Sequence, residues 1–562
     1  MFPERFFVKQ PTVFASGSCG TNMADDYRET SPVIQTTHGK IRGTVLKSLY
    51  DELFYAFDGI PYAVPPLGTL RFREPHDIKP WYGIRDCSKP QSKCLQVSSY
   101  TKQVEGSEDC LYLNVSVKKL VSEKPLPVMV YIHGGGYKGG DSSRQAWGPD
   151  YFMREDVIYI SIGHRLGPFG FLNFSDRSLD IPGNAGLKDI ILALRWIKAN
   201  ATRFNGDPER ITLFGHSSGS MIVHLLLVSP QTEGLFHKAI LMAGYSMELN
   251  RLPDMEFRLA KHLGYEGENI DSQVLDYLMK ADPNLLVSAN FFTKAENATG
   301  FLLAFVPCVE SYATKNAVLL GEPIDLHRNA WGNRIPIILG VNSGEGLGAF
   351  MRLNPTQLKD YQSNPERVLP SILRYRCDPG KRRELGQQLL SYFCQFHGHQ
   401  LTMENLKNLD NLFTHNMVHS MNRVIQSRLA YGKAPSYLYR FDFDSPDFNF
   451  YRIRFGGKEV RGVGHVDELG YIFVIPATFK LDQTRPEFTA ICRMVAMWVS
   501  FAATSDPNAD ITKPLVQWKP LNRFGPRMLL NINEELKFMP QPEYSKLTIY
   551  DRLFEQAEVP LF

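Results

Sequence analysis

A serine flanked by glycines, within residues 213–219, is the part of this chain best suited to covalent chemistry. The run reads LFGHSSG and fits the pattern Gly-x-Ser-x-Gly with Ser217 at its centre. A strand-like stretch, residues 211–214, leads into it, and a helix-forming stretch, residues 218–228, follows. This context is typical of a nucleophile elbow, a tight turn that exposes the serine hydroxyl. A chance match in a loop would lack both flanking elements, so we expect Ser217 to be a nucleophile.

Three consecutive glycines lie upstream, at the end of another strand-like run. Residues 130–137 read VYIHGGGY. Glycines leave backbone N–H groups uncovered, and such groups stabilise the oxyanion that forms when a nucleophile attacks a carbonyl. We assign an oxyanion hole to the N–H groups of Gly135, Gly136 and Ser218. A phosphate-binding loop is the alternative, but no Gly-Lys-Ser/Thr follows and no acidic residue is placed to bind a ribose.

A serine hydroxyl needs a base, and the base needs a carboxylate that orients it. Elbow enzymes of this type carry them in the order serine, acid, histidine. Of the fourteen histidines, His465 stands out because glycines flank it in the run GVGHVDE, residues 462–468. Other downstream histidines lie in a helical stretch and lack that setting: His397, His399, His415 and His419. For the acid, Glu345 follows the strand-like residues 335–341 in a glycine-rich loop, where active-site groups of α/β sheets gather. From the residues alone, other histidines and carboxylates remain candidates for the base and the acid.

The elements that must position these residues alternate along the chain. Longer amphipathic segments, such as residues 186–200 and 218–228, separate short apolar runs, which is typical of a mostly parallel sheet covered by helices. Residues 365–430 read as inserted helices. We expect an α/β fold in a single domain, residues 31–562, after an irregular segment, residues 1–30. The strand-length runs are residues 128–132, 157–162, 211–214, 239–242, 335–341 and 436–441.

Charge and composition narrow the class of protein. A net charge of +3 over 562 residues gives no indication of nucleic-acid binding. No apolar stretch approaches the roughly 18 residues that cross a bilayer, so we expect no transmembrane segment. Glu4, Arg5 and Lys9 interrupt the apolar start that a secretory signal would need, so we expect a cytoplasmic or peripherally microsomal protein rather than a secreted one. No zinc-type spacing of cysteine or histidine occurs, and we expect no metal and no cofactor.

Further ordered motifs support a family resemblance. They include FDGIPYA at 57–63, SEDCLYLN at 107–114, PGNAGLKD at 182–189 and GVGHVDELGYIF at 462–473. With the elbow, they resemble the type-B carboxylesterase family of α/β hydrolases, which includes the cholinesterases, over roughly residues 33–560. Within it the chain is most similar to insect α-esterases, as in YRFDFDS at 439–445. The resemblance implies an α/β-hydrolase fold, a large mostly parallel sheet flanked by helices.

The same resemblance implies activity and site residues. It places Glu345 at the acid position and His465 at the base position. It also implies hydrolysis of small hydrophobic carboxylesters and sensitivity to organophosphate inhibitors. Detoxification, lipid turnover and signal clearance all stay open as the role. Cys94 and Cys110 match the family's first disulfide, which forms or not according to the compartment. The short segment between them has no tryptophan, which argues against a choline ester as substrate.

The chain departs from the family beside the nucleophile. Relatives usually carry glutamate before it and alanine after it, where this chain has His216 and Ser218. Because an imidazole replaces a carboxylate, the field on His465 changes, and we expect altered rate and pH dependence. At the position of Ala243, relatives also often have a serine. The hydroxyl of such a serine could pair with Glu468.

Ester hydrolysis through a covalent acyl-enzyme is the function that these residues favour, with Ser217, Glu345 and His465 as the triad. Two alternatives stay open. The chain could be a non-catalytic binding or adhesion protein that keeps the fold, although such relatives usually lose the serine or the histidine. It could also be a slow-turnover scavenger of organophosphates or esters, an alternative that the unusual His216 keeps open.

Overall fold

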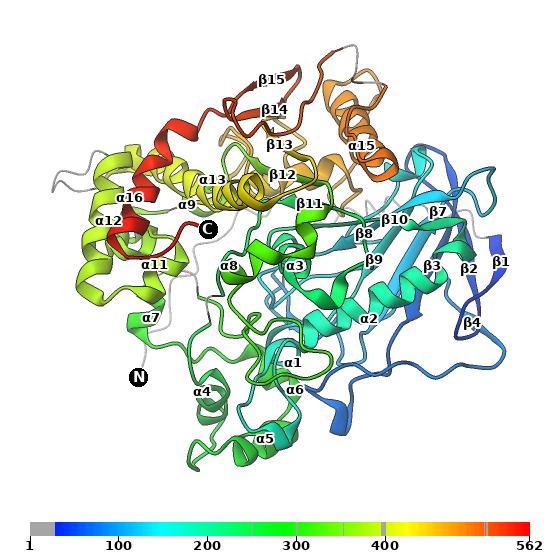
Figure 1. Cartoon of the computed structure of the whole chain (residues 1–562), viewed down its shortest axis with the longest axis horizontal. Helices are drawn as coiled ribbons and strands as arrows, with labels where there is room; N and C mark the ends of the chain where they lie inside the picture. Colours follow the sequence, from blue (N-terminus) through cyan, green and yellow to red (C-terminus); the bar gives the residue numbers. More distant parts are fainter. Residues whose placement is uncertain are drawn as a thin grey trace, which may run out of the picture.

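The computed structural model describes residues 29–562 apart from residues 100, 250, 299–301, 352, 395–400, 511, 513 and 514. Of the irregular segment expected at residues 1–30, only Glu29 and Thr30 are described, and they begin the first strand. One large sheet forms the centre of the molecule (Figure 1). Its strands, in spatial order, are β1 (Glu29–Gln35), β2 (Lys40–Lys47), β3 (Leu53–Pro61), β7 (Tyr112–Val117), β9 (Ile158–Ile162), β8 (Leu126–Ile132), β10 (Gly206–His216), β11 (Lys238–Met242), β12 (Ile337–Asn342), β13 (Ser436–Phe441), β14 (Met528–Ile532) and β15 (Leu536–Pro540), with β4 (Ile84–Asp86) beside β2.

The middle of the sheet is parallel and its edges are antiparallel. The strands from β9 through β8, β10, β11, β12 and β13 to β14 all pair in parallel, whereas β1 to β7 and β15 pair antiparallel with their neighbours along that path. Every residue of β8, β9, β11 and β12 is buried. Because parallel strands are covered on both faces, their sequences are continuous apolar runs. Each run expected from the sequence overlaps a strand, although residues 157, 335 and 336 precede the strands β9 and β12.

Alternation along β8 separates two hydrophobic cores. Val128, Val130 and Ile132 face a core with α2 (Ala185–Asn200), α3 (Ser218–Val228) and part of α13 (Leu406–Tyr431), whereas Met129 and Tyr131 face α15 (Pro486–Thr504). Helices therefore cover both faces of the sheet, and Figure 1 shows α2 and α3 on one of these faces. Together with the parallel strands, this arrangement confirms the expected α/β class.

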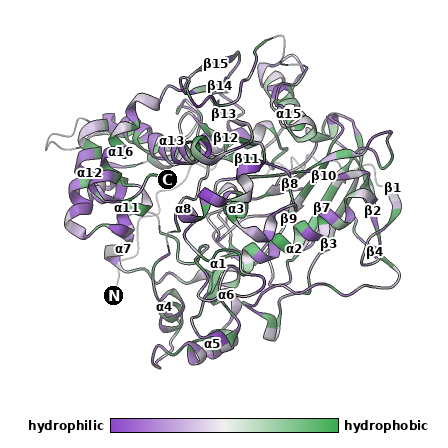
Figure 2. Cartoon of the chain, viewed as in Figure 1, coloured by the Kyte–Doolittle hydropathy of each residue, from purple (hydrophilic) through white to green (hydrophobic). Residues whose placement is uncertain are grey.

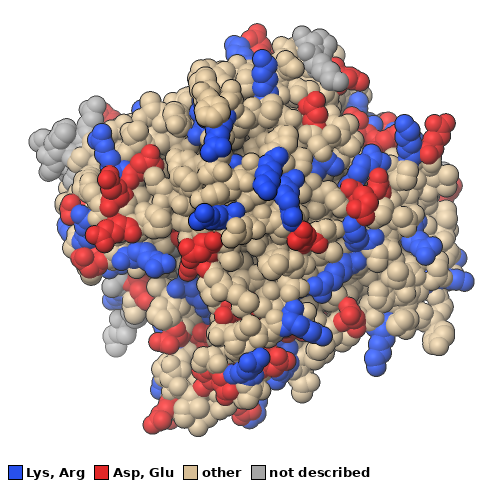
Figure 3. Space-filling view, in the orientation of Figure 1, with Lys and Arg blue, Asp and Glu red and all other residues tan. Residues whose placement is uncertain are grey.

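The expected helical insertion packs at one end of the sheet. It contains α11 (Ser371–Arg376), α12 (Pro379–Cys394) and α13, which form a third core with the C-terminal α16 (Thr548–Gln556). Figure 2 shows hydrophilic residues on the outer helices, such as α12 and α5 (Asp271–Lys280). On the face in Figure 3, acidic and basic side chains are interspersed. No helix of the described residues is long and apolar enough to span a membrane.

Candidate active site

The elbow at Ser217 joins the end of β10 to the start of α3. Ser217 has a φ of 56°, a left-handed conformation that is costly for a non-glycine residue and marks a constrained turn. Its N–H donates to the carbonyl of Met242 at the end of β11, 2.9 Å away. A Cβ at Gly219 would lie 2.2 Å from the carbonyl oxygen of Ile132, so only glycine allows this close approach of α3 to β8.

Glu345 and His465 meet although 120 residues separate them. Glu345 lies in the turn after β12, where its Oε1 accepts a hydrogen bond of 2.7 Å from the N–H of Asn342. Its Oε2 lies 2.6 Å from Nδ1 of His465. Burial alone would lower the pKa of His465, but the charge of Glu345 and its hydrogen bond, with smaller effects from Glu468 and Asp467, raise it. The imidazole is thus oriented and made more basic by a buried carboxylate.

Asp467 anchors the loop that carries His465, a role that the sequence did not reveal. Its Oδ2 accepts the Gly464 N–H at 2.7 Å, and its Oδ1 accepts the N–H groups of Tyr451 and Arg452, each at 3.0 Å. Burial raises the pKa of Asp467 to about 7 even though these N–H groups favour the charged form. Three backbone donors therefore hold the loop in one place.

Ser217 and His465 line the same cavity, which has a volume of about 1320 Å³. Gly134, Gly135 and Gly136 form part of its wall. Glu345 is not among the lining residues and lies behind the imidazole, with 3% of its side chain exposed. The lining also includes a set of apolar residues: Leu286, Phe291, Phe292, Leu303 and Phe305. A hydrophobic ligand can therefore reach the serine and the imidazole while the carboxylate stays shielded from water.

The glycine loop partly differs from the expected cluster of bare N–H groups. Gly135 and Gly136 have φ of 128° and 64°, and a Cβ at Gly135 would lie 2.0 Å from the carbonyl oxygen of Gly139. The Gly136 N–H, expected to be bare, donates to Oγ of Ser218 at 2.9 Å. Within the described part of the chain, the N–H groups of Gly135 and Ser218 have no protein acceptor. Two of the three assigned donors thus remain open to an oxyanion.

A second buried acid–imidazole pair lies against the first. Nε2 of His216 is 3.2 Å from Oε1 of Glu468, and the rings of His216 and His465 are 4.6 Å apart. Asn342 donates through Nδ2 to Glu468 and to the Gly464 carbonyl. Burial would raise the pKa of Glu468, but His216 and Asn342 outweigh it and lower that pKa. Asn342 thus supplies the donor to Glu468 that Ala243 lacks.

The histidines of the helical insertion lie elsewhere. His415 contacts the carbonyl of Asn411 at 2.6 Å and His419 contacts Asp551 at 3.0 Å, both as part of α13. His397 and His399 lie outside the described residues. Among the residues that the structure describes, no group of three or more His, Cys, Asp or Glu side chains could hold a metal ion.

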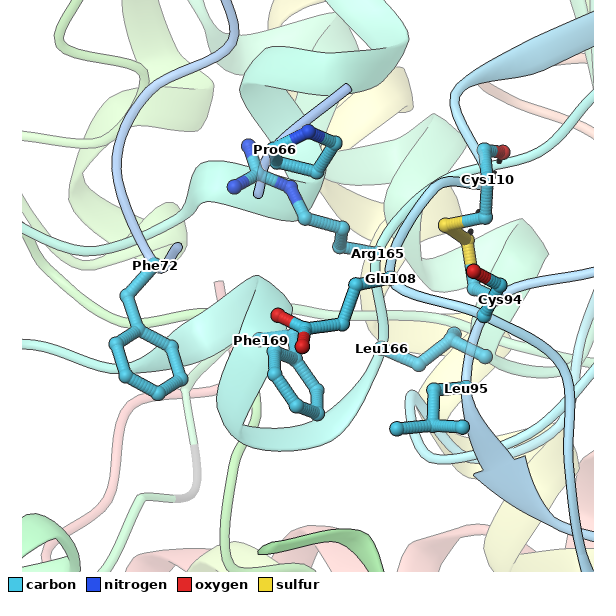
Figure 4. Close-up of a pocket in the computed structure, with 10 residues that line it drawn as sticks. Pro66, Phe72, Cys94, Leu95, Glu108, Cys110, Arg165, Leu166 and Phe169 are labelled. Atoms are coloured by element: carbon cyan, nitrogen blue, oxygen red, sulfur yellow. Dashed lines mark hydrogen bonds between the residues drawn. A yellow bond between two sulfur atoms is a disulfide. The ribbon is translucent and has the colours of Figure 1, made fainter. Parts of the chain in front are cut away.

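Cys94 and Cys110 form a disulfide with a sulfur–sulfur distance of 2.05 Å. Figure 4 shows this bridge next to Glu108 and Arg165, around a small pocket. The bridged segment also contacts the glycine loop. Gln96 accepts the Gly140 N–H at 2.7 Å and donates to the Gly140 carbonyl at 2.6 Å. The disulfide therefore braces one wall of the cavity.

Comparison with known proteins identifies the family of this chain. Residues 30–548 match the carboxylesterase family, and the chain belongs to that family. Esterase B1 of Culex pipiens is 32% identical over 546 residues, which cover 94% of this chain and 99% of that protein. Juvenile hormone esterase of Tribolium castaneum is 32% identical over 520 residues, 88% of this chain and 87% of that protein. The crystal structure of juvenile hormone esterase from Manduca sexta, with OTFP covalently attached, matches with a TM-score of 0.82 at 26% identity and covers 94% of this chain and 100% of that one. The expected α/β-hydrolase fold and family resemblance are confirmed.

Proposed function

We propose that this protein is a serine carboxylesterase in which Ser217, His465 and Glu345 hydrolyse hydrophobic carboxylic esters. The observation that carries the proposal is the 2.6 Å contact between Glu345 and His465, made beside a cavity that the elbow serine also lines. A strained serine, an oriented imidazole and open N–H groups in one cavity are the parts that acyl transfer needs. Membership of the carboxylesterase family supports the ester as substrate.

The reaction proceeds in two steps. Ser217 Oγ attacks the ester carbonyl carbon while His465 takes its proton, and the carbonyl electron pair moves to the oxygen. The N–H groups of Gly135 and Ser218 stabilise this oxyanion, and Glu345 stabilises the imidazolium. When the oxyanion collapses, the alcohol leaves with the proton from His465. Water then attacks the acyl-enzyme in the same way and releases the carboxylic acid.

The cavity supports a bulky hydrophobic substrate. At about 1320 Å³ it exceeds the range of about 300–1,000 Å³ that is typical of small-molecule sites. Phe291, Phe292 and Phe305 line the wall against which an acyl or alcohol chain would pack. The same serine would be phosphorylated by an organophosphate, because the imidazole activates it toward any electrophile that fits. Detoxification of foreign esters is a role that suits such a site.

The test compares wild type with Ser217→Ala on p-nitrophenyl esters of two to ten carbons. We expect many turnovers per wild-type molecule and a fall in kcat of about 10⁶ in the variant, as for loss of a nucleophile from a triad. Ser220→Ala is the matched control, because Ser220 lies on the same helix, donates to the Gly244 carbonyl at 2.6 Å and does not line the cavity.

The outcomes separate the alternatives. A Ser217→Ala variant that keeps wild-type turnover would refute the triad. One equivalent of p-nitrophenol followed by no further release from wild type would identify the slow-turnover scavenger. No release at all from a folded wild-type protein, across the ester series, would identify a non-catalytic binding protein.

A further inference from the structure

The side chain of Ser218 occupies part of the oxyanion-binding loop. Gly135, Gly136 and Tyr137 have φ of 128°, 64° and 60°, so three consecutive residues have positive φ. Successive N–H groups in turns of this kind form a concavity that binds anions or oxygen atoms. In this structure Oγ of Ser218 lies in it and accepts from Gly136 N–H at 2.9 Å and from Tyr137 N–H at 3.4 Å.

This contact has a direct consequence for the chemistry. A backbone N–H makes one strong hydrogen bond, and its strength falls when two acceptors share it. An oxyanion on the substrate and the Ser218 hydroxyl would compete for the same Gly136 N–H. The hydroxyl is held in place because Ser218 is 4% exposed and lies in the first turn of α3, so it does not swing away into solvent.

We propose that the Ser218 hydroxyl is an internal competitor for the Gly136 N–H and thereby weakens oxyanion stabilisation. This inference rests on the proposed esterase function and deepens it. Ser218 thus has two opposite effects: its backbone N–H points to the oxyanion, whereas its side chain occupies a neighbouring donor. An alanine at this position would keep the first effect and remove the second.

The expected size of the effect follows from the contribution of one oxyanion donor to kcat. Removal of a single oxyanion donor in comparable sites lowers kcat by about 10²–10³. Because Gly136 can still share its N–H with the oxyanion, the competition costs a part of that value. We therefore expect Ser218→Ala to raise kcat/KM for p-nitrophenyl butyrate by about tenfold, with no more than a twofold change in the dissociation constant of an unreactive hydrophobic alcohol.

A trifluoromethyl ketone provides a readout that a merely structural role would not change. Ser217 Oγ adds to its carbonyl carbon, the proton passes to His465, and the carbonyl pair becomes an oxyanion without any leaving group. Binding of its chain and formation of the new bond are the same in both proteins, so the difference in its affinity between wild type and variant reports oxyanion stabilisation. We expect about tenfold tighter binding to Ser218→Ala than to wild type, in parallel with kcat/KM.

One further variant completes the series. Ser218→Cys carries a weak acceptor and should fall between wild type and Ser218→Ala. The Cys variant also covers the case in which the alanine variant does not fold. If folded Ser218→Ala and Ser218→Cys match or fall below wild type in both kcat/KM and ketone affinity, the inference is overturned. The proposed function would then stand as long as Ser217→Ala remained inactive.

Discussion

Replacement of Glu345 by glutamine is the sharpest test of the proposed mechanism, because it removes a charge and keeps the shape. The carboxylate Oε2 lies 2.6 Å from Nδ1 of His465, and Oε1 accepts the Asn342 N–H. A glutamine oxygen can still accept that N–H. Its amide group would then face Nδ1 and favour the tautomer with the proton on Nε2, which cannot accept a proton from Ser217.

The magnitude follows from the distance. Two unit charges 2.6 Å apart, at an effective dielectric constant of about 20, attract with about 6 kcal/mol. At about 1.4 kcal/mol for each factor of ten, this sets a ceiling of between 10⁴ and 10⁵ on the loss of rate. Loss of the carboxylate charge from a Ser-His-Asp triad lowers kcat by about 10⁴, and we expect the same order of effect for Glu345→Gln.

The pH dependence gives a second, independent result. His465 must be neutral to accept the Ser217 proton, so activity falls as the pH drops below its pKa. Glu345 has the largest effect that raises this pKa, and burial opposes it. Without the carboxylate the pKa of His465 falls, a larger fraction of the imidazole is neutral at low pH, and the acid limb of the kcat/KM profile moves to lower pH.

The assay is hydrolysis of p-nitrophenyl butyrate from pH 5 to 9. The rate of spontaneous hydrolysis of the ester at each pH is subtracted. Asp410→Asn is the matched control: Oδ1 of Asp410 accepts the Gly346 N–H at 3.1 Å, so it supports the same loop without facing His465. The control should keep the wild-type acid limb. If Glu345→Gln kept kcat within tenfold of wild type, or if its acid limb stayed in place or moved upward, the assigned role of Glu345 would be refuted.

Two predictions concern stability, both measured by urea unfolding. Replacement of Cys94 and Cys110 by alanine should lower the free energy of unfolding by about 3 kcal/mol, because the bridge closes a segment with a sequence separation of 16. Reduced wild type should match the variant. An unchanged urea midpoint would contradict the stabilising role of the disulfide. His216→Ala should lower the free energy of unfolding by about 3–5 kcal/mol, because the fully buried Glu468 loses a partner 3.2 Å away. Adding Glu468→Gln to this variant should recover part of that loss. Strictly additive losses would show that the two side chains do not interact.

The centre of the fold could be predicted from the sequence, whereas its edges could not. The central strands are buried on both faces, so their apolar runs are continuous and easy to find. Strand β1 has only one fully buried residue, and β4 has none, so neither gives an apolar run. Both strands are held by pairing with β2, and local composition does not predict such pairing.

The site follows the same division. Ser217, Glu345 and His465 could be proposed because each sits in a glycine-rich loop, and the first two directly follow strands, a local signal. The roles of Asn342 and Asp467 depend on which distant N–H or carboxylate each meets, and nothing near them in the sequence says so. The bond from Gly136 to Ser218 depends on a side-chain rotamer and on the path of the glycine loop. Such contacts require coordinates.

Strand order explains how residues so far apart in the chain converge. Ser217 follows β10 and Glu345 follows β12, and these parallel strands are separated only by β11. The residues at the end of β11 must therefore leave room for the loops that carry Ser217 and Glu345. A Cβ at Gly244 would lie 2.0 Å from the carbonyl oxygen of Ser217, so the residues after β11 are small where the elbow passes. Ala243 fits this constraint, and Asn342, at the end of β12, supplies the polar contact to Glu468. The lack of a hydroxyl at Ala243 therefore does not leave Glu468 without a donor, because the neighbouring strand supplies one.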